Sequence, residues 1–164
     1  MVVSRASNEL ARLFQRHAFD SEAALDAFAR EVLGTLLLER TRSRVELVRE
    51  LSDWRSADAM FQRRAACIAL SVIAPQGDAA CEGFTRLSLA LCSACVWSIE
   101  LGDQTAVGSL LRELSHAEPA RVDAFVRRHA RFMSPECMDA AIERLPDDRQ
   151  RALREHWQRA VTLR

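Results

Sequence analysis

The sequence predicts an all-α protein of about nine helices. Hydrophobic residues recur roughly every 3.6 positions along almost the whole chain, and the strict alternation that is typical of strands is missing. Short stretches rich in Gly, Pro, Asp and Ser separate these periodic segments. Because such short turns return the chain on itself, we expect sequential helices to pack as antiparallel pairs, in either a short HEAT-like solenoid or a compact helical bundle.

Length and composition favour one α-helical domain that spans residues 1–164. A chain of 164 residues with 49% hydrophobic content is large enough to bury a core of its own. The 23 basic and 23 acidic residues cancel, so the whole molecule lacks the strong positive field of a dedicated nucleic-acid binder. Basic residues nevertheless exceed acidic ones in segments 40–64 and 121–164, which leaves an acidic segment between two basic ones.

Five cysteines and no signal peptide indicate reduced thiols in an intracellular, cytoplasmic protein without a membrane span. Cys92 and Cys95 form a CxxC pattern, but they fall within an apolar segment that lacks a second such pair. A structural zinc site requires four converging ligands. We therefore expect these thiols to pack in the core, with no metal and no cofactor.

The first helix is expected from Ser4 to Ala18. Asp20 or Ser21 is placed to cap the second, whose apolar residues run from Leu25 to Leu37. The segment Ser43–Glu46 has the spacing of a capping box, in which a serine and a glutamate satisfy each other's free backbone donors, and it should open the third helix.

The centre of the chain carries its most apolar segment. Ser56 is expected to cap a helix that ends before Pro75. The next helix is predicted over Cys81–Leu101, capped by Asp78 and terminated by Gly102. Its apolar residues lie on nearly every side, so it should be the most buried helix of the fold.

Proline and aspartate mark the helices that follow. Asp103 should begin a helix that stops before Pro119, and Pro119 suits the first turn of the next one. Ser134-Pro135 has the pattern of a cap followed by a first-position proline. A last helix is expected after Pro146.

Several segments of the chain resemble the AlkD-like DNA alkylation repair glycosylases, which are built from HEAT-like helical repeats. The segments are Asp53-Trp54, Phe61–Leu70, Ala94–Trp97 and Val122–Val126 leading into Met133-Ser134. The resemblance implies a helical-repeat protein that holds duplex DNA on an Arg-lined concave surface and removes cationic alkylated purines.

The same resemblance implies that Trp97 and Glu100 are the candidate catalytic residues. An indole face attracts a cationic base, and a carboxylate stabilises the positive charge that develops on the sugar as the glycosidic bond breaks. The family places its carboxylate four positions after the tryptophan, where this chain has Leu101. The resemblance therefore leaves open whether the protein retains catalytic activity.

Duplex DNA is the partner that the resemblance implies, and arginines of the two basic segments are the candidate phosphate contacts. These residues are Arg63, Arg64, Arg127, Arg128 and Arg131. Two other interpretations stay open. The arginines can be solvated helix faces with Trp97 in the core, and the protein can be a non-catalytic scaffold or adaptor that binds another protein through an apolar groove.

Overall fold

The computed structural model describes residues 19–39 and 42–162, and every regular element in those residues is helical. The helix expected over residues 4–18 lies outside the described residues. The described α-helices are α2 (Glu22–Phe28), α3 (Thr35–Glu39), α4 (Arg44–Asp53), α5 (Met60–Ser71), α6 (Phe84–Cys95), α7 (Leu101–Leu114), α8 (Pro119–His129), α9 (Pro135–Ile142) and α10 (Asp147–Thr162). The π-helical segment Ala29–Gly34 joins α2 to α3. No described helix is long and apolar enough to cross a membrane.

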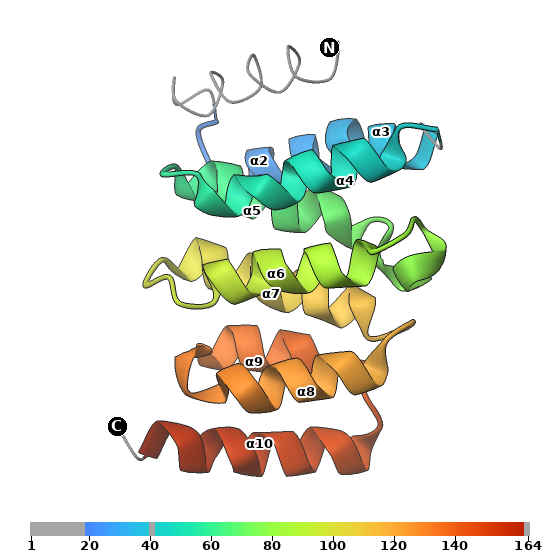
Figure 1. The fold of residues 1–164 in the computed structure, drawn as a ribbon. Coiled ribbons are helices and arrows are strands. Elements are labelled where there is room, and N and C mark those ends of the chain that lie inside the picture. The colour runs from blue at the N-terminus through green and yellow to red at the C-terminus, as the bar shows by residue number, and fades with distance from the viewer. Residues whose placement is uncertain (1–18, 40–41, 163–164) are drawn as a thin grey trace.

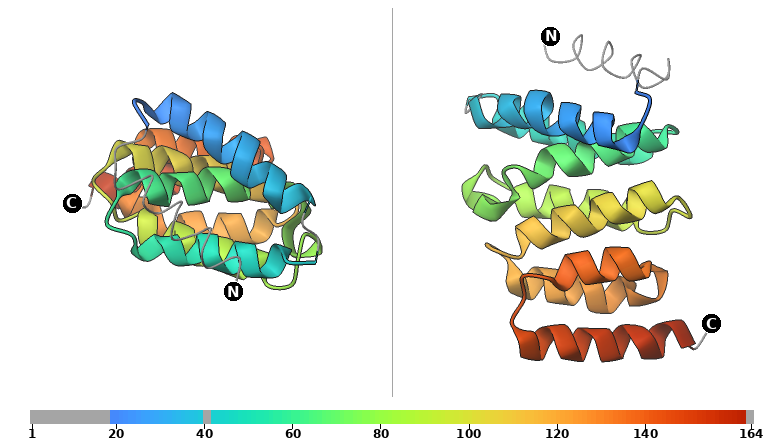
Figure 2. Two further views of the ribbon diagram at one scale, coloured as in Figure 1. Left: turned by 90° about the horizontal axis from the view of Figure 1, so that it is seen from above. Right: turned by 180° about the vertical axis from the view of Figure 1, so that it is seen from behind.

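Alternate helices form two layers, as the sequence predicts for antiparallel pairs (Figure 1). One layer contains α2 with α3, then α5, α7 and α9, and the other contains α4, α6 and α8. The closest packing lies in the first layer, where α7 contacts α5 on one side and α9 on the other. The last helix, α10, packs against α8 and closes the end of the stack (Figure 2).

Small residues allow the helices of the first layer to approach one another. Every residue of α5 from Arg64 to Ser71 is buried. On α7, a Cβ atom built on Gly108 would lie 2.9 Å from the backbone oxygen of Cys137 and 3.0 Å from the Cβ of Ala140, both on α9. Glycine at this position is therefore what permits the close approach of α7 and α9.

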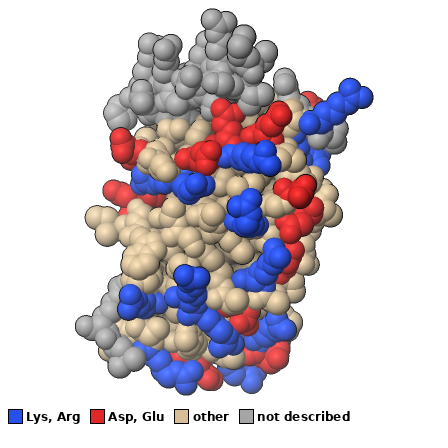
Figure 3. All heavy atoms as spheres, viewed as in Figure 1, with Lys and Arg blue, Asp and Glu red and all other residues tan. Residues whose placement is uncertain are grey.

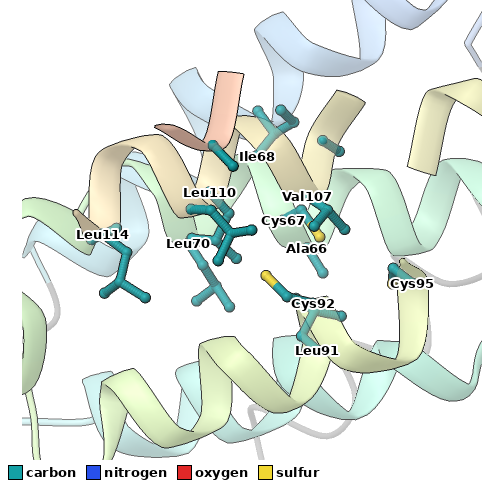
Figure 4. Packing of buried hydrophobic residues seen from close by; sticks show 14 of the residues in the cluster. Ala66, Cys67, Ile68, Leu70, Leu91, Cys92, Cys95, Val107, Leu110 and Leu114 are labelled. Atoms are coloured by element: carbon teal, nitrogen blue, oxygen red, sulfur yellow. The ribbon is translucent and has the colours of Figure 1, made fainter. Parts of the chain in front are cut away.

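The core between α5, α6 and α7 is filled by aliphatic side chains and thiols. Figure 4 shows side chains from all three helices pointing toward one another. The labelled residues are Ala66, Cys67, Ile68 and Leu70 of α5, Leu91, Cys92 and Cys95 of α6, and Val107, Leu110 and Leu114 of α7, and all are buried. The predicted packing role of Cys92 and Cys95 agrees with this burial.

The predicted helix over Cys81–Leu101 is wrong at both ends, because α6 begins at Phe84 and is six residues shorter than predicted at its C-terminus. The helix stops at Cys95, and Leu101 instead begins α7, so Gly102 lies in the first turn of a new helix. The side-chain amide of Gln104 donates to the carbonyl oxygen of Val96 at 2.6 Å and to that of Ser98 at 3.2 Å. The carbonyl oxygens of Val96 and Ser98 lie where the helix is interrupted, and these two hydrogen bonds satisfy them. A pattern of apolar residues in the sequence gives no sign of such hydrogen bonds. Helix α5, which is buried without interruption from Arg64 to Ser71, is more continuously buried than α6.

Some of the predicted helix caps are confirmed by the structure and others are wrong. Ser21 caps α2 by accepting from the amide of Ala24, and Ser134 caps α9 by accepting from that of Cys137. Asp78 is not the N-cap of α6, which is Gly83, but its carboxylate accepts from the amide of Thr85, in the first turn of that helix, at 2.8 Å.

Ser43 and Ser56 do not act as predicted. Ser43 precedes α4 without a side-chain capping bond, because its backbone is not extended at φ −112° and ψ 12°. Ser56 ends a 3₁₀ turn, and α5 begins later, after Ala59.

We expect Gly108→Ala to lower the free energy of unfolding by about 1–3 kcal/mol, because the added methyl group meets the α9 backbone and forces the two helices apart. The gain in helix propensity, at most about 1 kcal/mol, should not offset this. Gly102→Ala is the matched control, since its methyl group meets the ends of the flexible Met60 and Glu22 side chains. Urea unfolding of both variants checks the expectation, and an equal loss in the two would contradict it.

Candidate nucleic-acid interface

A basic groove of about 410 Å³ lies between α6 and α8. The two helices contribute nearly equal numbers of residues to its apolar floor and charged rim. The lining residues are Arg86, Leu89, Ala90 and Ser93 of α6, and Arg121, Ala124, Phe125, Arg128 and His129 of α8. Figure 3 views this face and shows basic side chains across its middle and lower parts, with uncharged surface between them. The groove can therefore take a ligand that is anionic and also offers apolar surface.

Both sides of the groove lead toward an aromatic pair. Along α6, the lining residues run from Arg86 to Ser93, and Trp97 follows in the turn after the helix ends at Cys95. Along α8, the lining residues from Arg121 continue toward Phe132 in the same way. The rings of Trp97 and Phe132 meet with their centroids 3.6 Å apart.

The aromatic pair is open to solvent on its tryptophan side. Trp97 is 57% exposed. The guanidinium carbon of Arg131 lies 4.4 Å from the centroid of the Phe132 ring, so a cation is already present beside this ring. The indole of Trp97 offers the remaining aromatic surface. The expectation that Trp97 is a core residue is therefore wrong, because the chain leaves the helix before it.

The arginines on this face differ in how far carboxylates neutralise them. Within the described part of the chain, no carboxylate forms an ion pair with Arg86, Arg128 or Arg131. Arg121 pairs loosely with acidic side chains at 3.5 and 3.6 Å, and Arg127 pairs closely with Asp123 at 2.6 Å. The unpaired arginines are the ones with charge to offer an anion.

Arg64 lies inside the protein, on α5 in the opposite layer from the groove. Arg64 is only 7% exposed. Two of its guanidinium nitrogens donate to the two carboxylate oxygens of Asp26 on α2, each at 2.8 Å. A third nitrogen donates to the carbonyl oxygen of Gly102 at 2.7 Å and to the hydroxyl of Thr105 at 2.8 Å, both on α7. Its donors thus join α2, α5 and α7.

Arg63 is engaged in the same way. Its guanidinium donates to one carboxylate oxygen of Asp103 at 2.6 and 3.0 Å, and to the carbonyl oxygens of Ala57 and Asp58. Burial lowers the pKa of Arg63, but the hydrogen bond to Asp103 and the nearby negative charges, that of Glu100 included, outweigh this and raise it. Arg63 and Arg64 therefore do not share a face with Arg128, and their donors serve the contacts between helices.

Glu100 and Trp97 lie in the turn between α6 and α7, and not on the single helix that the sequence predicts over Cys81–Leu101. Glu100 is exposed and immediately precedes α7. Its amide donates to the hydroxyl of Ser98 at 3.1 Å. The structure still brings the two predicted catalytic residues close together, on one five-residue turn at the end of the groove.

The sequence matches the family described as DNA alkylation repair enzyme over residues 4–145. This chain belongs to that family. The match runs through α9 and includes the groove, the aromatic pair and the turn between α6 and α7. Family membership supports a function in DNA alkylation repair. No curated protein and no solved structure matches the chain.

Sequence reasoning missed several residues of the site in this DNA alkylation repair protein. Arg86 lies in a predominantly apolar helix, where the sequence pattern does not mark it as part of a site. Phe132 becomes part of the site through its contact with Trp97, 35 positions earlier in the chain. Gln104 gives no signal in the sequence, and Asp103 is predicted only to begin a helix, because their partners Val96 and Arg63 become neighbours only after folding.

His129 contributes to the floor of the groove. Its Nε2 atom lies 3.1 Å from the hydroxyl of Ser93, and its ring stacks on Phe125 with centroids 4.3 Å apart. Burial, and to a smaller degree the charge of Arg128, lowers the pKa of His129. The imidazole is therefore neutral at pH 7, and the positive charge of the groove comes from its arginines.

The thiols of this repair protein are mostly internal. Cys67, Cys92, Cys95 and Cys137 are buried, and Cys81 is half-buried. A hydrogen bond to Cys95 together with burial raises the pKa of Cys67, and burial raises the pKa of Cys92 and takes that of Cys137 to about 12. No group of three or more His, Cys, Asp or Glu side chains in residues 19–39 and 42–162 could hold a metal ion.

We expect a thiol reagent at pH 8 to label Cys81 first in the native protein and the four buried cysteines only after unfolding, because burial excludes the reagent and disfavours the thiolate. Mass spectrometry of labelled peptides identifies the modified residues. Metal analysis of the same sample should find no stoichiometric zinc. Rapid native labelling of Cys67 or Cys92 would contradict the assignment.

We expect Arg64→Gln to lower the free energy of unfolding by about 3 kcal/mol, because it leaves the Asp26 carboxylate without its partner in a largely buried contact. Arg128→Gln should change stability by at most about 0.5 kcal/mol, since Arg128 is exposed and unpaired. Chemical unfolding of the two variants separates structural from surface arginines. Equal stability of the two variants would show that the Arg64 contacts contribute little.

Proposed function

We propose that this protein binds duplex DNA along the groove between α6 and α8 and recognises an alkylated base at Trp97. One observation carries the proposal: a groove lined by arginines lies between α6 and α8, and beyond the C-terminal ends of these helices an exposed tryptophan stacks on Phe132. The match to the DNA alkylation repair family supports DNA as the ligand. The overall neutral charge of the chain is compatible with this, because Figure 3 shows basic side chains on the face that carries the groove.

The groove supplies contacts to the DNA backbone. Arg86, Arg128 and Arg131 carry charge that no described carboxylate neutralises, and a guanidinium binds a phosphate with two parallel hydrogen bonds. Such contacts position a duplex without reading its sequence. A repair protein needs this property, because damage arises in any sequence.

Trp97 supplies the selectivity for damage. Alkylation of a purine ring nitrogen gives the base a positive charge, and an indole face attracts a cation more strongly than it attracts a neutral base. More than half of Trp97 is exposed, so a base can reach it. Phe132 supports the indole from the other side, and Arg131 lies against the Phe132 ring.

Glu100 is the residue that we assign to excision. Cleavage of the glycosidic bond places positive charge on the deoxyribose, and a carboxylate beside the sugar stabilises that charge. Glu100 is exposed and lies three residues from Trp97 in the same turn. Asp103, the other acidic residue nearby, is 1% exposed and bonded to Arg63, so it serves the structure.

We propose that the protein is a HEAT-like solenoid. We also propose that it acts inside the cell, where DNA is found. The pairs α4 with α5, α6 with α7 and α8 with α9 are its repeating units. In a solenoid, each pair contacts mainly its neighbours, and the stack presents one extended face to a long ligand. The alternative, a scaffold that binds a protein, would use the apolar floor of the same groove.

Salt dependence of DNA affinity tests the binding step. With about three phosphates neutralised, log K should fall with log salt at a slope of about −2 to −3. Arg128→Gln should make that slope shallower by about 1, and the matched control Arg30→Gln, on the opposite layer, should leave it unchanged. Fluorescence anisotropy of a labelled duplex measures both. A slope near zero would instead favour the apolar contact of an adaptor.

Trp97→Ala tests recognition, and Glu100→Gln tests excision. The wild-type protein should bind a duplex with N7-methylguanine more tightly than an undamaged one, and Trp97→Ala should abolish this preference while retaining salt-dependent binding.

Glu100→Gln should retain the preference but slow base release by roughly 100-fold. Release of free base is followed by chromatography. Equal preference in Trp97→Ala and wild type would refute the recognition step.

A further inference from the structure

Ser93 and His129 form a polar pair in the floor of the groove between α6 and α8. The Oγ atom of Ser93 lies 3.1 Å from the Nε2 atom of His129, so one hydrogen bond joins the two helices here. The imidazole is only 7% exposed and stacks on Phe125, whereas Ser93 is half-buried. Of the two polar groups, the serine hydroxyl is therefore the one that is open to a ligand.

The surroundings of His129 favour a neutral ring with its proton on Nε2. In residues 19–39 and 42–162, no group forms a hydrogen bond with its buried Nδ1 atom. A proton on Nδ1 would thus be a buried donor without an acceptor, which is rarer in folded proteins than an unsatisfied acceptor. A proton on Nε2 has the hydroxyl oxygen of Ser93 as its acceptor. Burial and the charge of Arg128 lower the pKa of His129, so both also oppose the doubly protonated ring.

This tautomer leaves the hydroxyl proton of Ser93 free. A hydroxyl has one proton, and a serine that donates it to a histidine has none for a ligand. When Nε2 of His129 donates to Oγ, the Ser93 hydroxyl donates into the groove instead. An anion in the groove then faces the positive ends of two consecutive hydrogen bonds, and each bond polarises the other. The pair therefore offers a strengthened donor to an oxyanion.

The charges of the groove favour an anion at the end where Ser93 and His129 lie. Helices α6 and α8 run in the same direction, so this pair, near the last residues of both helices, marks one end of the groove (Figure 1). Arg128 lines the groove beside the pair, and no carboxylate of the described residues forms an ion pair with it. Arg121, two turns earlier on α8, already has two carboxylates near it.

The carbonyl oxygens at this end of the groove oppose an anion only weakly. Helix C-termini carry partial negative charge, because their last carbonyl oxygens have no partner within the helix. Here donors from other elements satisfy such groups. The carbonyl oxygen of Val96 accepts from Gln104 at 2.6 Å, and that of Arg127 accepts from Nε2 of His156 at 3.0 Å. The full charge of Arg128 therefore dominates.

We propose that Ser93, His129 and Arg128 form a binding subsite for one phosphate group. The phosphate accepts a hydrogen bond from the Ser93 hydroxyl, and such a bond to an ionised oxygen is short and strong. Arg128 supplies the compensating charge. His129 is a positioning residue, because it acts on the phosphate only through Ser93. This inference rests on the proposed function only for the source of the phosphate, which is then the backbone of a duplex.

Inorganic phosphate tests the subsite without DNA. Nitrogen-15 NMR of the imidazole distinguishes a protonated ring nitrogen from an unprotonated one. At pH 7, His129 of the wild type in the presence of phosphate should carry its proton on Nε2 and none on Nδ1. Ser93→Ala should weaken phosphate binding by about tenfold, because it removes a hydrogen bond to a charged acceptor. Ser93→Thr, which keeps the hydroxyl, should restore it.

Ser109→Ala is the matched control for both probes. Ser109 is also a half-buried helical serine, but it lies on α7 in the opposite layer, and its hydroxyl donates to the backbone oxygen of Thr105. This variant should bind phosphate as the wild type does. A loss equal to that of Ser93→Ala would show that the effect is not local to the groove, which would refute the subsite.

A labelled duplex tests the source of the phosphate. Ser93→Ala should lower the affinity for an undamaged duplex by about tenfold. It should leave the slope of log K against log salt unchanged, because a neutral hydroxyl displaces no counterion. Arg128→Gln should instead make that slope shallower, so the two variants differ in kind. Fluorescence anisotropy at several salt concentrations measures the affinity and the slope.

The outcomes separate the subsite from the proposed function. If Ser93→Ala binds phosphate and duplex as the wild type does, or if His129 carries its proton on Nδ1, the subsite is refuted. Salt-dependent duplex binding that Arg128→Gln weakens would then leave the proposed function standing. If phosphate binds as expected but the duplex shows no salt-dependent binding, the proposed function fails. The subsite then stands as a site for a free phosphate group.

Discussion

The buried guanidinium of Arg64 is the contact on which the rest of this structure depends. It bonds to Asp26 on α2, to the backbone of Gly102 and to Thr105 on α7, so one side chain of α5 joins three helices of the same layer. A buried charge is costly unless its partners are complete. The arrangement is therefore intolerant of displacement, and it fixes where α7 begins.

The position of α7 determines the shape of the functional end of the molecule. Because α7 starts at Leu101, the five preceding residues form a turn instead of continuing α6. Gln104, in the first turns of α7, satisfies the carbonyl oxygens of that turn and one of the following α8–α9 connection. The same residue thus brings Trp97 and Phe132 to one place, where their rings stack. The aromatic pair is a consequence of how α7 is fixed.

Arginine serves two distinct purposes in this protein. On α5 it joins helices, with donors paired to carboxylates and carbonyl oxygens inside the fold. On α6 and α8 it lines an open groove, where Arg86 and Arg128 have no carboxylate partner among the described residues. A planar guanidinium suits both purposes, because it presents several donors in one fixed geometry. The neutral net charge of the chain conceals this division.

The sequence by itself determined the helical class, the family and most helix starts. Periodic apolar residues and local caps such as Ser21 and Ser134 act over a few positions, so they can be read along the chain. Only the tertiary structure decided that Trp97 is exposed, that Arg64 is internal, and that the helix predicted to Leu101 ends at Cys95. Each of these depends on a partner 30 or more positions away, such as Phe132 for Trp97 or Asp26 for Arg64, or on the hydrogen bonds of Gln104 across a turn. Local pattern contains no information about such partners, since the backbone groups and charges that they satisfy become neighbours only when the layers pack.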